Sequence, residues 1–76
     1  MTDITELKQG DTVRLLDFGL TEAPYRRRLL SLGITRGVVF SVLRVAPLGC
    51  PVLVDVRGTA LTLRKEEARQ LVLERL

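Results

Sequence analysis

The sequence predicts a small, mainly β fold: a barrel of five or six short strands, one short helix at about residues 23–32, and a helical turn near residues 65–70. Short runs rich in valine and leucine alternate with turns that contain glycine or proline. Helical periodicity is clear in one stretch alone. The run 38–45 is apolar on both faces, as in a strand that crosses the middle of a small barrel. With 76 residues, we expect a single domain, 1–76.

The N-terminal third is expected to hold a helical turn, a loop and a strand. Residues 4–7 look like one turn of helix, begun by Thr2 or Asp3. Residues 8–11 form a turn, since Gly10 adopts a positive φ easily. Residues 12–18 follow as a strand, but Leu16 and Phe18 fall out of alternation with Val13 and Leu15. A bulge near Leu16 would reconcile the two patterns.

The start of the helix is indicated by two residues. Thr21 is expected to be the N-cap, and Pro24 suits the first turn because its missing N–H would have no partner there. Tyr25, Leu29 and Leu32 then recur at helical spacing and form one apolar stripe. We expect this stripe to lie in the core, the alternative being a surface that faces a groove.

The helix should end at Gly33, placed where a left-handed residue belongs, with Ile34 folding back onto Leu29. A tight turn at Gly37 leads into the strand 38–45, whose Phe40 and Val42 are expected in the core. Residues 46–51 form a loop, because two prolines and a glycine cannot sustain a strand. Strands at 52–56 and 60–63 surround a turn at Gly58, and a last strand covers 71–73.

Composition limits the kind of protein. The net charge is +3, a mild excess of twelve basic over nine acidic residues, and there is one cysteine. Disulfide stapling is therefore excluded within the chain, and Cys50 is expected to be an ordinary reduced thiol. The N-terminus lacks the features of a signal peptide, and no apolar run approaches the roughly 20 residues that span a bilayer. We expect a cytoplasmic protein with no direct membrane insertion.

Basic residues gather on the helix and provide the candidate binding surface. Arg26, Arg27 and Arg28, with Arg36 and Arg44 nearby, could meet acidic groups of a partner through bidentate pairs. The alternative is a solvated helix face that keeps an apolar protein in solution. Leu48, held between a proline and a glycine, is a candidate apolar anchor beside this patch. Its alternative is to fold back onto the open end of the barrel.

Metal binding and catalysis have no obvious participants. The chain has no histidine and one cysteine, and its carboxylates show no spacing typical of a metal site. A nucleophile with a neighbouring base is also absent, as is a phosphate-binding loop of the GxxxxGK[ST] kind. We therefore expect no metal site, no cofactor and no enzymatic activity.

The run from Tyr25 to Ile34, followed by Gly37, Phe40, Val42 and residues 44–49, resembles the FeoA family of bacterial ferrous iron uptake proteins. The resemblance extends to the turns at Gly10 and Gly58 and to residues 60–65. It implies an SH3-like barrel that acts as an accessory or regulatory subunit of FeoB, a membrane ferrous iron transporter with a cytoplasmic GTPase domain. Iron-dependent repressors carry the same barrel. Because 76 residues leave no room for their other domains, we expect a free-standing protein. Cys50 does not belong to the family pattern.

Other interpretations follow from the same residues. The arginines could bind nucleic acid, or the chain could be an iron-responsive, transcription-associated SH3-like module, although stacking aromatic residues are scarce. A receptor for proline-rich peptides is disfavoured because such grooves are lined with aromatic residues, of which this chain has three. Weak self-association is also open. We expect a protein partner, exerting any role in iron uptake through FeoB, and no nucleic acid.

Overall fold

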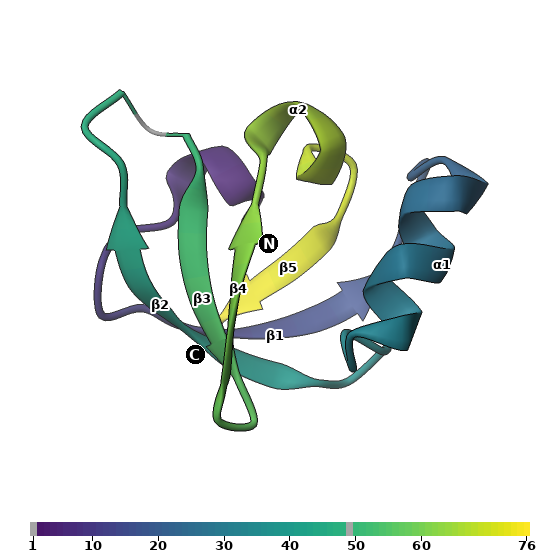
Figure 1. Ribbon diagram of the computed structural model, residues 1–76, viewed down its shortest axis with the longest axis horizontal. Helices are drawn as coiled ribbons and strands as arrows, with labels where there is room; N and C mark the ends of the chain where they lie inside the picture. The colour runs from purple at the N-terminus through teal and green to yellow at the C-terminus, as the bar shows by residue number, and fades with distance from the viewer. Residues whose placement is uncertain (1, 49) are drawn as a thin grey trace.

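The computed structural model describes residues 2–48 and 50–76, and it shows five antiparallel strands with two short helices and one 3-10 turn (Figure 1). The elements follow the chain as η1 (Ile4–Glu6), β1 (Thr12–Asp17), α1 (Ala23–Ser31), β2 (Val39–Val45), β3 (Val52–Val56), β4 (Thr59–Leu63), α2 (Lys65–Ala68) and β5 (Val72–Arg75). The strands form one curved sheet in the order β4-β3-β2-β1-β5. The prediction of a mainly β fold with five strands is confirmed. Within the described residues the sheet is open, since β4 and β5 each pair with one neighbour.

The N-terminal elements form where the sequence predicts them. Asp3 caps η1 by accepting a hydrogen bond from the backbone N–H of Thr5 at 2.8 Å. Gly10 has a φ of 92°, as its turn requires. The pairing of β1 with β5 shifts register between Leu15 and Asp17, which confirms the bulge expected near Leu16.

The helix begins differently from the prediction and ends as predicted. Glu22 is the N-cap of α1 and makes no side-chain capping bond, with Pro24 in the first turn. Thr21 was the wrong choice, because its hydroxyl instead donates to the carbonyl of Phe18 at 2.5 Å and is buried in the preceding turn. At the other end, Ile34 N–H bonds the carbonyl of Leu29 at 2.9 Å.

Gly33 completes this helix stop. Its N–H bonds the carbonyl of Leu30 at 3.1 Å, and its φ is 93°. Together with the bond from Ile34 to Leu29, this is a Schellman motif, in which the left-handed position favours glycine. Leu29 and Ile34 are both 1 % exposed and lie in the core, so the stop also fastens α1 to the sheet.

The core fills the concave side of the sheet. Its buried members come from η1, every strand, both helices and the turns beside them; the largest fully buried side chains are Ile4, Leu15, Leu29, Ile34, Leu63 and Leu73. Phe40 and Val42 of β2 are buried as predicted, but Val39 and Leu43 are exposed. Both faces of β2 are apolar, as the sequence shows, but the outer face is left uncovered because no layer of the described structure packs on it.

The β3–β4 connection is a two-residue turn. Val56 pairs with Thr59, while Arg57 and Gly58 between them have φ values of 52° and 88°. Two successive positive φ angles give the twist that joins adjacent antiparallel strands tightly. Gly37 plays a similar local role before β2, with a φ of 85°.

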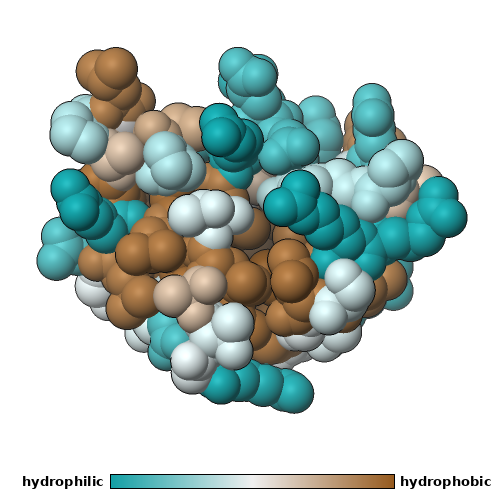
Figure 2. Space-filling view, viewed as in Figure 1, coloured by the Kyte–Doolittle hydropathy of each residue, from teal (hydrophilic) through white to brown (hydrophobic). Residues whose placement is uncertain are grey.

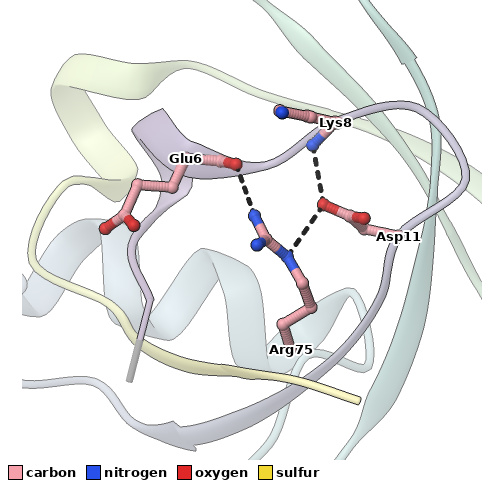
Figure 3. A network of polar contacts seen from close by, with 4 residues as sticks. All are labelled: Glu6, Lys8, Asp11 and Arg75. Carbon is pink, nitrogen blue, oxygen red and sulfur yellow. Dashed lines mark hydrogen bonds and ion pairs between the residues drawn. The ribbon is translucent and has the colours of Figure 1, made fainter.

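The two ends of the chain meet on β5. Thr2 bridges Leu73 through two backbone hydrogen bonds of 2.8 and 3.2 Å. Arg75 contacts Asp11 at 3.2 Å and donates to the carbonyl of Glu6 at 2.6 Å, while the same Asp11 carboxylate accepts from the N–H of Lys8 (Figure 3). These contacts hold the last strand against the first turns of the fold.

Candidate protein-binding surface

The helix α1 divides its side chains between two sides. Tyr25, Arg28, Leu29 and Leu32 recur on one side and line a groove against β4. Arg26 and Arg27 are exposed and do not line it. The run of three arginines is thus split, with two facing away from the sheet and one facing the groove.

Leu32 does not lie in the core, contrary to the prediction for the apolar stripe. Its side chain is 42 % exposed, whereas Leu29 is buried and Tyr25 is half-buried. Leu32 caps the end of α1, where the chain turns away at Gly33 and no described element covers it. The groove-facing alternative fits Leu32 and Tyr25, and the core interpretation fits Leu29.

Ion pairs distinguish the outer arginines from others in the chain. Arg36 pairs with Asp17 at 3.0 Å, Arg14 with Glu74 at 3.3 Å and Arg75 with Asp11 at 3.2 Å. Arg26 and Arg27 form no ion pair with any of the described residues. Their guanidinium groups are therefore available for carboxylates of another molecule.

The structure does not bring Arg44 and Leu48 next to these arginines. Arg44 lies near the end of β2 and Leu48 in the loop that follows, on the opposite side of the molecule from α1 (Figure 1). Leu48 is 95 % exposed, so it does not fold back onto the sheet. The candidate residues form two separate surfaces, and the expectation of one contiguous patch is wrong.

A groove of about 340 Å³ separates α1 from β4 and the start of α2. The wall opposite α1 consists of residues 60–64 and Glu67. Apolar surface is visible over the middle of this face of the molecule, with hydrophilic side chains around it (Figure 2). The groove lining therefore combines apolar side chains, among them Leu29, Leu32 and Leu61, with the charged groups of Arg28, Arg64 and Glu67.

Tyr25 sits where this groove meets a second, acidic hollow. That hollow is lined by Leu20, Thr21, Glu22, Tyr25, Glu66, Glu67 and Gln70. Burial, with a smaller contribution from the negative charge of Glu67, raises the pKa of the Tyr25 hydroxyl above its usual value. The phenol thus stays neutral at physiological pH and can donate or accept a hydrogen bond.

The acidic residues do not assemble into a metal centre in the part of the chain that is described. No three side chains among the described cysteine, aspartate and glutamate residues lie close enough to hold one ion. Cys50 is exposed. Among the described helices, none is both long and apolar enough to cross a bilayer.

The FeoA domain family matches residues 2–75 of the chain. This protein belongs to the FeoA family. The FeoA protein of Chlorobium tepidum is 40% identical and superimposes with a TM-score of 0.87, over 99% of this chain and 70% of that one. The FeoA-like protein of Clostridium acetobutylicum is 32% identical, with a TM-score of 0.81 over 100% of this chain and 91% of that one.

FeoA of Stenotrophomonas maltophilia shows what kind of fold this is. It is 27% identical, with a TM-score of 0.79 over 97% of this chain and 91% of that one, and it is described as a prokaryotic SH3 domain protein, crystallised with zinc. The SH3-like fold implied by the resemblance is therefore confirmed, as is the link of the family with ferrous iron transport.

Several groove residues were missed by the sequence analysis. Leu61, Arg64 and Glu67 line the groove from β4 and α2, far along the chain from α1. Nothing in local spacing shows that these segments meet α1, because the contact depends on how the sheet curves. The apolar stripe on α1 was the one available signal.

Proposed function

We propose that this protein is a non-enzymatic accessory subunit of ferrous iron uptake that binds the cytoplasmic part of a FeoB-type transporter. Membership of the FeoA family supports the link with iron transport. The Stenotrophomonas relative has been put forward as a ferrous iron transport activating factor. In this chain, the observation that carries the proposal is the pair Arg26 and Arg27, exposed on α1 without an intramolecular partner among the described residues.

A protein partner suits these arginines better than nucleic acid. Proteins that bind single strands stack bases on exposed aromatic side chains. Here Phe18 and Phe40 are buried in the core, and Tyr25 is half-buried on the side of α1 away from Arg26 and Arg27. The outer side of α1 thus offers positive charge without stacking surfaces. Carboxylates of a protein are matched ligands for such guanidinium groups.

The test is co-purification of the transporter with two double variants. Arg26→Glu combined with Arg27→Glu reverses charge on α1, while Arg44→Glu combined with Leu48→Ser alters the opposite side of the molecule. All four side chains are exposed, so both variants should fold normally. We expect the α1 variant to lose the transporter and the loop variant to retain it, with and without guanine nucleotide. Normal recovery of the transporter by the α1 variant would contradict the assignment to Arg26 and Arg27.

A further inference from the structure

The free edge of β4 borders the groove beside α1. β4 pairs with β3 on one side and has no strand neighbour on the other among the described residues. All five residues from 60 to 64 line the groove, opposite Tyr25, Arg28 and Leu32. A sheet edge and a helix side with apolar residues and one arginine therefore face each other across an open space.

The register shows which backbone groups point into that space. Val56 and Thr59 close the two-residue turn, so they form a hydrogen-bonded pair, and Leu61 and Leu63 repeat this arrangement along β4. The intervening residues, Ala60 and Thr62, direct their N–H and C=O groups away from β3. These are the groups that an additional strand would bond.

Natural proteins usually protect such an edge with a charge, a proline, a bulge or a covering segment. The β4 sequence Thr-Ala-Leu-Thr-Leu contains neither charge nor proline, and its pairing with β3 is regular throughout. The other edge strand, β5, carries Glu74 and Arg75 and is bridged by Thr2. One edge is thus guarded and the other is left open beside a groove.

Charge at the groove indicates the chemistry of the occupant. Arg57 and Arg64 flank β4 at its two ends, and Arg28 faces it from α1, with Glu67 the one carboxylate on the lining. Two copies of this chain paired antiparallel through β4 would place Arg57 of one beside Arg64 of the other. Like charges on adjacent strands repel, which disfavours such a dimer. Acidic residues at both ends of an incoming strand would instead be attracted to Arg57 and Arg64.

We propose that an extended segment of a partner protein adds to β4 as a sixth strand, with apolar side chains at alternate positions in the groove and acidic residues at its ends. Strand addition supplies affinity through the backbone and selectivity through alternate side chains. The apolar side chains would lie against Tyr25, Leu32 and Leu61. The inference concerns a surface other than Arg26 and Arg27 and does not depend on the proposed function.

The test uses a synthetic peptide, Glu-Val-Thr-Val-Thr-Val-Glu, blocked at both ends and titrated into the unaltered protein. We expect amide exchange at Ala60 and Thr62 to slow by about tenfold or more at saturation, as hydrogen bonds form there. The same peptide with N-methylated backbone amides should not bind, since it cannot donate to β4. Lysine in place of both glutamates should weaken binding by about threefold at low salt.

Variants of the protein provide the complementary test. Thr62→Pro removes the outward N–H, a position at which an edge strand tolerates proline, and should abolish binding, while Thr62→Val should bind normally. If Thr62→Pro unfolds the protein, the N-methylated peptide still decides the question on the unaltered chain. Unchanged exchange at Ala60 and Thr62 with millimolar peptide would overturn the proposal. So would equal binding of the N-methylated peptide, or dimerisation of the free chain through β4.

Peptide binding and transporter binding can be told apart. Arg26→Glu combined with Arg27→Glu should still bind the peptide, because neither residue lines the groove. A protein that binds the peptide but never recovers the transporter would support strand addition and contradict the proposed function. A protein that recovers the transporter but does not bind the peptide would support the proposed function and contradict strand addition.

Discussion

The two edge strands of the sheet, β4 and β5, have the same length to within one residue but are finished in different ways. On β5, the outward N–H of Leu73 bonds Thr2, and Arg75 is held by Asp11 and Glu6. On β4, Ala60 and Thr62 have no such partners among the described residues, and α1 stands off across a groove. The backbone and side-chain contacts that protect a sheet edge are therefore concentrated on β5, and the edge of β4 stays accessible.

Matched truncations inside the two strands should give the largest contrast. Leu73→Ala removes a fully buried side chain and should lower the free energy of unfolding by about 3 kcal/mol. Leu61→Ala, at a half-buried position beside the groove, should cost about half of that. Denaturant unfolding of the two variants measures both. Equal losses would show that β4 is packed as firmly as β5 and would contradict the expected difference between the two edges.

Hydrogen exchange tests the edges without any substitution. The amide of Leu73 should exchange about fivefold more slowly than those of Ala60 and Thr62, because its bond to Thr2 contributes roughly 1 kcal/mol beyond the opening of the strand. Exchange followed by NMR near neutral pH resolves the three amides. Comparable rates would mean that the β4 edge is covered in solution.

The polar contacts that guard β5 should have a smaller effect. Asp11→Asn removes the charge that pairs with Arg75 and should lower the free energy of unfolding by about 0.5 kcal/mol, because both side chains are partly exposed. Arg36→Gln, which breaks the exposed pair with Asp17 away from β5, is the matched control. If Asp11→Asn lowers the free energy of unfolding no more than the control does, the contact between Asp11 and Arg75 does not stabilise the β5 edge.

The smallest expected effect on stability comes from the ionisation of Tyr25, which lies in the groove wall opposite β4. The raised pKa of Tyr25 means that the folded protein holds this proton more tightly than the unfolded chain. The associated stability is fully present below the pKa of the unfolded state, near 10, and is lost as pH rises through the higher pKa of the folded state. Because the chain has one tyrosine and no tryptophan, absorbance titration reports this group alone. A midpoint at or below that of the unfolded chain would show that Tyr25 is solvated.

Features set by a few neighbouring residues could be predicted from the sequence. The helix stop depends on Gly33 and Ile34, and the bulge in β1 on a break in alternation at Leu16, so both appear in local patterns. The N-cap was missed because Thr21 had a closer partner in the carbonyl of Phe18. The exposure of Leu32, and of Val39 and Leu43 on β2, depends on which faces other elements cover, which apolar content does not reveal.

The candidate site could be predicted only in part, for the same reason. Arg26 and Arg27 are on the surface, where helical periodicity places them. Their separation from Leu48 follows from the curvature of the sheet and the direction of β2, which no spacing along the chain encodes (Figure 1). The groove likewise requires β4 and α2 to meet α1, although two further strands separate them in the sequence.

The pairing of β1 with β5 has a consequence for the order in which the sheet forms. β2, β3 and β4 follow one another through short connections, so they can pair early in folding. The outer edge of β1 stays unpaired until residues 72–75 fold onto it. A partly folded chain in which β5 has not yet docked therefore exposes the edge of β1 as well as that of β4. Docking of β5 covers the edge of β1 and leaves β4 as the unprotected edge of the described sheet.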